Sequence, residues 1–351
     1  MSHRLTRRQA LAAGAVFAGT AAGTASASEI KLSDAINMSW SRTEGLRRDL
    51  TPGKTPIRLA CWGSTTTFDS RTPGESLTEM VKRIRDRGYT SANTITPPGK
   101  ESFWLNASDS EIAEFKSALK KYDVTIFDVH VYVNNIHPDL SIRLQNLKHT
   151  ATQCEAAERI GSPMVTTHTG SCSEISPVTI HPENWTLAAW KTSVQSIKQI
   201  LKDTAGMKVS LGIEALNLIN INNPKAHLRL MEDVGDTRCR VCFDPTNMMS
   251  TEKYFHYTEI INEGFDILGE NIMACHAKDS LITPDKMSAY LTQVPPGEGV
   301  NDYETYLVRL SRMKWPRTLL IEHLSDDKYP AAKEYIARTA AKVGVKIHGE
   351  G

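Results

Sequence analysis

The stretch NIMACHAKDS, residues 271–280, is an apolar run that ends abruptly in polar residues. Its first half, IMAC, has the short apolar character of a buried strand, and His276 follows it at once. A single polar residue at a strand end is common. The same ending recurs in other runs of this chain, and the spacing of those runs decides the fold.

Eight short apolar runs alternate with amphipathic segments of helical period from residue 57 onward. The predicted strands are residues 57–62, 90–96, 124–131, 163–169, 208–215, 239–244, 271–276 and 317–323. The clearest helix follows the fourth run, where apolar residues recur every three or four positions at Leu187, Trp190, Val194, Ile197 and Leu201. Strands that are buried on both faces and separated by helices form a parallel sheet. Eight such units predict an α/β fold, the closed (β/α)8 TIM barrel.

An open, doubly wound sheet is the alternative arrangement of the same elements. No G-x-G-x-x-G motif follows the first run, so a dinucleotide-binding half has no support. The chain also has no linker rich in Ser, Pro or Gly, and residues 57–351 are therefore predicted to form a single domain.

The six cysteines follow no framework spacing. Cys239 and Cys242 are spaced like a chelating pair, but they lie in a strand-like run, where residues three apart face opposite sides. We therefore interpret them as small buried residues.

Residues 1–27 have the features of a secretory signal peptide, with a basic start, a short apolar run and an A-x-A ending. Arg7 and Arg8 predict twin-arginine export and hence a periplasmic location. Residues 28–56 show no strand pattern and are predicted to form an N-terminal arm. No other apolar run is long enough to span a bilayer, so no stable membrane anchor is expected.

The net charge of the chain indicates whether a nucleic-acid partner is expected. The full chain has 41 Lys+Arg, 40 Asp+Glu and a formal net charge of +1. Removing the predicted signal, which carries three arginines and no acidic residue, leaves a net charge of about −2. Proteins that bind nucleic acid usually present a basic excess, so we expect no nucleic-acid partner.

Active sites of (β/α)8 barrels form at the C-terminal ends of the strands. Four consecutive runs end in a side chain of metal-ligating type: Glu214, Asp244, His276 and Glu322. Each shares a strand face with the residue two positions earlier, which is Gly212, Cys242, Ala274 or Leu320. Three of these four are small, as suits positions near a barrel axis. One such carboxylate alone would be interpreted as a solvated charge or a helix cap, but four in succession predict a metal site. The oxygen-rich set suits Mn²⁺, Mg²⁺ or Co²⁺ better than a structural Zn²⁺.

These strand ends carry a resemblance to a known family. The motifs GIEALN (212–217), VCFDPTN (241–247), CHAKD (275–279) and LLIEH (319–323) resemble those of the xylose isomerase-like TIM-barrel superfamily, the sugar phosphate isomerase/epimerase group. PPGEGVNDY, residues 295–303, looks like the Gly-x-Gly loop of that family. The resemblance covers residues 57 to about 345.

The resemblance implies a function. In that family one divalent metal, here expected to be Mn²⁺, is held by the residues that match Glu214, Asp244, His276 and Glu322. The two matching glutamates also serve as acid/base groups on the two faces of a sugar. The implied activity is a sugar isomerase or epimerase that removes the proton next to a carbonyl and passes through an enediolate. The implied partner is a small sugar or keto-sugar, and the chain could form a homo-oligomer, as is usual in the family.

Further residues on the same rim are predicted to contact the substrate. They are His130, His168, Lys278, Asn247 and Trp62. Each has a structural alternative: the histidines could cap loops, the lysine could be solvated, and Trp62, like Trp104 in the second loop, could pack in the core.

Two positions depart from the pattern of the ketose 3-epimerases. Asn247 stands where those enzymes commonly have histidine, and Ile282 stands where they commonly have arginine. Both positions normally contact the substrate, so a free ketose is in question. A metal-dependent lyase that acts on 3-keto-glycosides with the same base chemistry stays open, as does a non-catalytic, exported sugar-binding barrel. A DNA-repair endonuclease of this fold would need more histidines at the rim.

Overall fold

A computed structural model describes residues 49–62, 74–95, 102–283 and 287–349. The predicted signal peptide and most of the predicted arm lie outside the described residues. Residues 49–56 are described, and they are attached to residues 311–313. The Gly53 N–H donates to Ser311 Oγ at 2.8 Å, and Thr55 Oγ1 donates to the Met313 carbonyl at 2.6 Å.

Eight parallel strands form one sheet in the order β1, β10, β7, β6, β5, β4, β3, β2. Their bounds are β1 Arg58–Cys61, β2 Ser91–Ile95, β3 Thr125–His130, β4 Met164–Thr167, β5 Ser210–Glu214, β6 Cys239–Phe243, β7 Ile272–Ala277 and β10 Thr318–Ile321. The Thr90 N–H donates to the Leu59 carbonyl at 3.1 Å and so brings the two edge strands together. The result is a nearly closed barrel. The predicted (β/α)8 fold is confirmed, and each of the eight predicted runs corresponds to one strand, with β7 extending one residue beyond its run.

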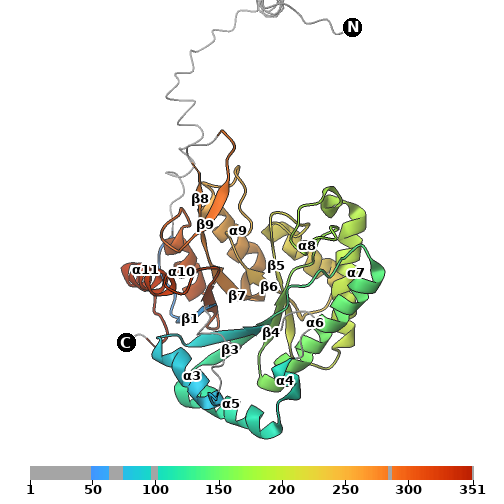
Figure 1. The fold of residues 1–351 in the computed structure, drawn as a ribbon. Helices are drawn as coiled ribbons and strands as arrows, with labels where there is room; N and C mark the ends of the chain where they lie inside the picture. Colours follow the sequence, from blue (N-terminus) through green and yellow to red (C-terminus); the bar gives the residue numbers. More distant parts are fainter. Residues whose placement is uncertain (1–48, 63–73, 96–101, 284–286, 350–351) are drawn as a thin grey trace, which may run out of the picture. The chain divides into compact units, whose positions relative to one another are not determined.

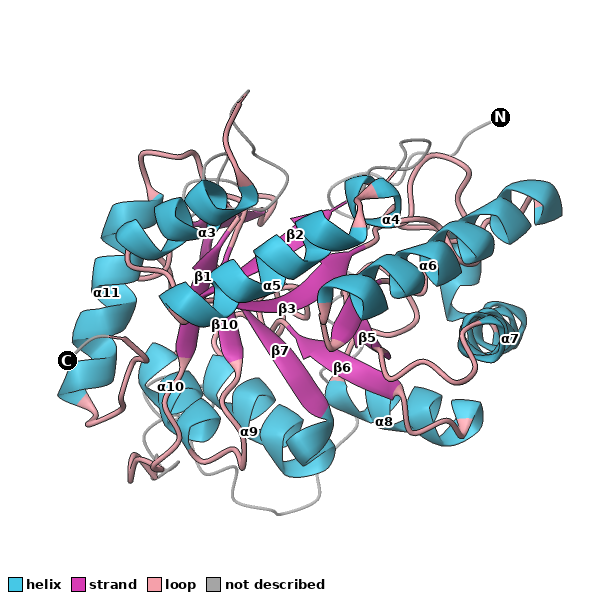
Figure 2. Cartoon of the chain, turned by 90° about the horizontal axis from the view of Figure 1, so that it is seen from below, coloured by secondary structure: helices cyan, strands magenta, loops and turns pink. Residues whose placement is uncertain are grey.

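Helices surround the strands (Figures 1 and 2). Their bounds are α3 Leu77–Asp86, α4 Phe103–Asn106, α5 Asp109–Tyr122, α6 Leu140–Ile160, α7 Leu187–Asp203, α8 Pro224–Val234, α9 Tyr257–Leu268, α10 Tyr303–Ser311 and α11 Tyr329–Lys342. Short 3₁₀ turns cover Pro182–Trp185 and Gly269–Asn271. The main apolar core lies between strands and helices. Among the described residues, no helix combines the length and apolar character needed to cross a membrane.

Local sequence signals explain where the helices begin and end. Ser76 and Ser108 each form a capping box that starts α3 and α5. The long α6 ends at Gly161, whose φ of 82° lies in the left-handed region that glycine adopts most easily. The predicted amphipathic helix is confirmed as α7, which starts after the cap Thr186.

A second, smaller cluster fills the barrel interior. It contains Ala60, Phe127, Met164, Cys242, Ala274 and Leu320. Gly212 belongs to the same layer, because a Cβ there would lie 2.3 Å from Met164 Sδ. The predicted inward face of the last strands is therefore confirmed. Cys239 and Cys242 both carry free thiols and lie on opposite sides of β6, since Cys239 packs in the main core.

The structure also contains an antiparallel hairpin that the sequence did not predict, formed by β8 Asp279–Ile282 and β9 Leu291–Val294. Its first residue, Asp279, is buried, and its carboxylate accepts backbone N–H groups of Ser280, Gly297 and Asn301 at 2.8 to 3.0 Å. A Cβ at Gly299 would lie 2.2 Å from the same carboxylate. The Gly-x-Gly loop is thus fixed by close approach of its backbone to Asp279.

Candidate metal centre

The ends of β5, β6, β7 and β10 bring four buried side chains together. Glu214, Asp244, His276 and Glu322 are each at most 2% exposed, and each offers a ligand atom within 4.8 Å of the others. The strand register is staggered, because His276 pairs with Leu320, two residues before Glu322, and Glu214 pairs with Cys242, two residues before Asp244. The tilt of barrel strands compensates for such a stagger, and the four side chains meet at the same end of the barrel.

His276 lies among the three carboxylates. Its Nδ1 is 2.7 Å from Glu322 Oε1, 3.0 Å from Glu214 Oε1 and 3.7 Å from Asp244 Oδ2. The other ring nitrogen, Nε2, is 3.2 Å from Cys242 Sγ. One edge of the imidazole therefore faces the oxygen donors and the other edge faces a thiol.

Lys278 also lies in this cluster. Its Nζ is 2.8 Å from Asp244 Oδ2, 2.7 Å from Glu322 Oε1 and 3.9 Å from Glu214 Oε1. The lysine is 3% exposed, so the interpretation as a solvated surface residue is wrong. Its ammonium offsets part of the negative charge of the buried carboxylates.

The shifted pKa values follow from these contacts. Burial would raise the pKa of Glu214, but His276 and Lys278 outweigh that effect and hold the pKa well below its usual range. The same balance lowers the pKa of Glu322. Burial would lower the pKa of His276, yet its neighbours Cys242, Glu322 and Glu214 hold that pKa well above its usual value. The cluster therefore strongly favours positive charge at its centre.

The buried carboxylate oxygens of the cluster have few partners. Glu322 Oε2 has no hydrogen-bond partner among the described residues, and Asp244 Oδ2 and Glu322 Oε1 are contacted through ion pairs with Lys278 and His276. Buried carboxylate oxygens without partners are costly, and a hard cation would satisfy them. The donor set therefore fits a divalent ion.

Two neighbours hold the Glu214 carboxylate. The Tyr132 hydroxyl donates to Oε2 at 2.8 Å, and Asn247 Nδ2 donates to Oε1 at 2.8 Å. Lys278 Nζ donates to Asn247 Oδ1 at 3.3 Å. Tyr132 was not predicted from the sequence, although it lies two residues after His130 and so follows the same strand parity.

Aromatic rings pack beside this carboxylate. Trp62 stacks with Tyr132 at a centroid distance of 6.2 Å and lies 5.7 Å from the ring of His323. Tyr132 in turn stacks with His168 at 4.9 Å. Trp104 is instead a core residue, because it is 2% exposed and its Nε1–H donates to Thr94 Oγ1 at 3.0 Å.

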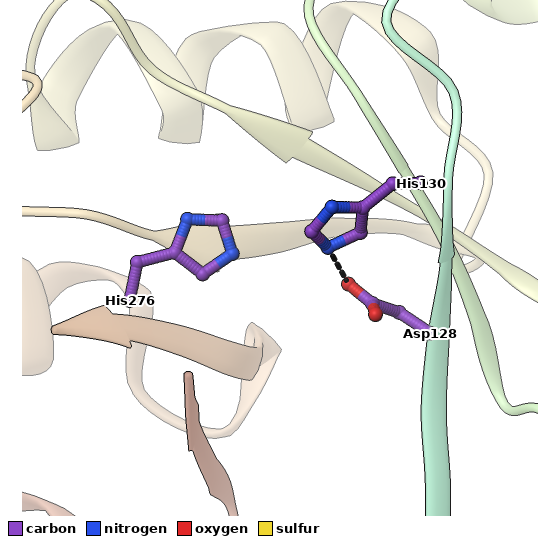
Figure 3. Close-up of side chains that lie close together, drawn as sticks. All are labelled: Asp128, His130 and His276. Atoms are coloured by element: carbon purple, nitrogen blue, oxygen red, sulfur yellow. Dashed lines mark ion pairs between the residues drawn. The ribbon is translucent and has the colours of Figure 1, made fainter. Parts of the chain in front are cut away.

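The two predicted rim histidines both lie in this region. His168 Nδ1 is 3.0 Å from the Glu214 carbonyl oxygen. His130 is completely buried, and its Nε2 lies 2.8 Å from the Asp128 carboxylate (Figure 3). Asp128, His130 and His276 also place donor atoms within 4.8 Å of one another, so this second group shares His276 with the first.

One residue of the rim has an unusual backbone. His323, directly after Glu322, has φ of 60°. This left-handed conformation is uncommon for a residue with a Cβ, and such residues concentrate at functional sites. The side chain is exposed, with Nε2 3.7 Å from Glu322 Oε2 and Nδ1 3.3 Å from Gln293 Oε1 of β9.

The sequence profile of the xylose isomerase-like TIM barrel family matches residues 81–344. The chain belongs to this family. No curated protein sequence matches the chain.

Solved structures share the fold at low sequence identity. D-psicose 3-epimerase with D-tagatose from Clostridium cellulolyticum H10 is 14% identical with a TM-score of 0.55, covering 82% of this chain and 96% of its own. A xylose isomerase-like TIM barrel protein from Mycobacterium smegmatis in complex with magnesium is 13% identical with a TM-score of 0.57, covering 82% and 96%. The probable 3-DHS dehydratase AsbF, involved in petrobactin synthesis in Bacillus anthracis, is 13% identical with a TM-score of 0.58, covering 80% and 97%.

Proposed function

We propose that this protein is a divalent-metal-dependent sugar isomerase or epimerase, which removes the proton next to a carbonyl. The observation that carries the proposal is the buried group Glu214, Asp244, His276 and Glu322, whose ligand atoms lie within 4.8 Å of one another and whose three carboxylates face one ammonium. Sugar epimerases and a magnesium-bound protein share its fold.

The same four residues would hold the ion. Three carboxylates and one imidazole suit Mn²⁺, with Mg²⁺ or Co²⁺ as alternatives and Zn²⁺ less suited. A divalent ion held there would supply Lewis-acid polarisation of a carbonyl oxygen and stabilise the negative charge that develops next to it.

Glu214 and Glu322 are the proposed acid/base groups. The low pKa of each keeps it ionised at neutral pH, which is the form that accepts a proton, so a glutamate acts as donor only after it has taken up a proton. Tyr132 and Asn247 hold Glu214 through one oxygen each and so fix its plane. The two glutamates come from β5 and from the residue directly after β10, so they reach the cluster from separate strands.

The substrate is proposed to be a small sugar or keto-sugar. The rings of Trp62 and His323 offer an apolar wall against which a sugar face packs. His168, Asn247 and Lys278 offer nitrogen donors for its hydroxyl and carbonyl oxygens. We also propose that a twin-arginine signal in residues 1–27 directs export of the mature chain.

Hydrogen exchange at carbon tests the proposal. The mature protein, loaded with Mn²⁺ in D₂O, is incubated with free ketoses and with 3-keto-glucosides, and the C–H next to the carbonyl is followed by NMR. We expect deuterium uptake that a chelator abolishes. Glu214→Gln should lose this exchange while its circular dichroism is unchanged. The matched control is Glu263→Gln, which changes a glutamate that pairs with Lys225 in α8. Normal turnover by Glu214→Gln would contradict the role of Glu214.

A lyase is the second candidate function. Lys278 places an ammonium among the ligands, and Asn247 replaces the histidine of the ketose 3-epimerases, so the site differs from theirs where the substrate would bind. A probable dehydratase also shares the fold. Proton removal followed by loss of a group from a 3-keto-glycoside would release an aglycone in the same NMR experiment, whereas an isomerase would release none. Sugar binding that is unaffected by chelator, without any exchange, would favour a non-catalytic binding barrel.

A further inference from the structure

The two nitrogens of His276 face different chemical groups. Nδ1 faces Glu322, Glu214 and Asp244, with its shortest distance 2.7 Å to Glu322 Oε1. Nε2 faces Cys242 Sγ at 3.2 Å. Both side chains are completely buried, so water does not compete for this contact.

The orientation of the ring fixes where its proton must be if the site binds a metal. A metal ligand uses the lone pair of an imidazole nitrogen, and the nitrogen facing the carboxylates is Nδ1. A neutral imidazole then carries its single hydrogen on Nε2. That hydrogen points at sulfur, which is within the distance of an N–H···S hydrogen bond.

We propose that Cys242 is a positioning residue for the metal ligand His276, because its sulfur accepts the Nε2–H and so keeps the Nδ1 lone pair aimed at the three carboxylates. The inference rests on the proposed metal site, but not on the reaction carried out there. Metal-bound histidines usually donate this second hydrogen to a carboxylate, a carbonyl or water, and that partner fixes the ring and tunes its basicity. Here a thiol takes that place.

An alternative acceptor near the ring is Asp128, which has a carboxylate oxygen within 4.8 Å of a ring nitrogen of His276. Asp128 Oδ2 accepts Thr166 Oγ1–H at 2.7 Å and lies 2.8 Å from His130 Nε2, and Oδ1 has no hydrogen-bond partner among the described residues. The ring centre of His130 lies 5.7 Å from that of His276 (Figure 3). Neither oxygen of Asp128 is hydrogen-bonded to His276, so Cys242 is the partner that the described residues provide.

The fold explains why Cys242 can reach the ring. It pairs with Ala274 in the register of β6 and β7, two residues before His276 on the same face. The small Ala274 side chain leaves sulfur and imidazole in contact. A thiol is also a weaker acceptor than a carboxylate, so it donates less electron density through the ring and leaves a bound ion a stronger Lewis acid.

Co²⁺ binding tests this inference without any substrate. The metal-free chain and its Cys242→Ala, Cys242→Ser and Cys239→Ala variants are titrated with Co²⁺ and followed by calorimetry and visible absorption. Cys239→Ala is the matched control, since it removes a buried thiol from the opposite face of the same strand. We expect Cys242→Ala to bind Co²⁺ about ten- to a hundredfold more weakly than the wild type. Cys239→Ala should bind like the wild type, and Cys242→Ser should recover affinity because its hydroxyl accepts the same hydrogen.

Three results would overturn the inference. Equal Co²⁺ affinity of Cys242→Ala and Cys239→Ala would mean that the thiol only fills space. A thiolate-to-cobalt charge-transfer band in the wild type that Cys242→Ala lacks would make Cys242 a ligand itself. Failure of the wild type to bind Co²⁺ would remove the proposed metal site, and the inference would fall with it.

Discussion

Replacement of Lys278 by methionine tests how the buried charges of the candidate metal centre are balanced. Methionine keeps an unbranched apolar chain but removes an ammonium that lies 2.8 Å from Asp244 and 2.7 Å from Glu322. Removing one partner from a buried ion pair typically costs about 3–5 kcal/mol, because the remaining charges lose their compensation. For a domain of this size that cost lowers Tm by roughly 6–10 °C.

Metal should reverse most of this loss. A divalent ion brings two positive charges to the same carboxylates, so the penalty of Lys278→Met should be largest in EDTA and smaller in excess Mn²⁺. The assay is urea unfolding of the wild type and the variant under both conditions. Lys225→Met is the control, because Lys225 forms an exposed pair with Glu263 that is worth at most about 1 kcal/mol. Equal losses for the two variants in EDTA, or a loss for Lys278→Met that Mn²⁺ leaves unchanged, would refute the reasoning.

Two further predictions concern stability. Burial lowers the pKa of His227 to about 4 from its ordinary 6.5, so its contribution to stability is fully present above pH 6.5 and is lost as pH falls toward 4, by up to about 3 kcal/mol. His227→Leu should remove this part of the dependence of the unfolding free energy on pH, measured by urea unfolding at each pH. An unchanged pH dependence would contradict the prediction. Gly212→Ala should lower the free energy of unfolding by about 1–3 kcal/mol, because its Cβ would overlap Met164 Sδ. The double variant Gly212→Ala, Met164→Val should recover part of that loss. Simple additivity of the two single changes would argue against the overlap.

The barrel could be predicted from the sequence because its signals are local. Apolar runs alternate with segments of helical period. In each of the last four strands, the residue two positions before the polar one indicates which face of the strand points inward. The small side chains of Cys242 and Ala274 marked the inward face correctly. The β8–β9 hairpin gave no such signal, since its position depends on the buried Asp279 and the loop that binds it.

The sequence predicted the four residues that converge in the candidate site, and also Lys278 and Asn247 beside them, but not Tyr132 or Asp128. Tyr132 and Asp128 lie two residues on either side of His130, so strand parity was the signal that could have placed both near the site. What parity cannot give is the partner across the barrel. The hydrogen bond from Tyr132 to Glu214 spans two strands, and only the assembled fold shows it.

The net charge of the buried cluster determines which cation it would favour. Three buried carboxylates face one ammonium, so with a neutral, metal-binding His276 the cluster has a charge of about −2, which two further positive charges neutralise. Because an unbalanced buried charge is expensive, the cluster favours a divalent ion over a monovalent one. Asn247 fits the same logic, because one neutral amide both donates to Glu214 and accepts from Lys278 without adding a charge. The departure from histidine at this position therefore preserves the balance of the centre while changing what a substrate would meet there.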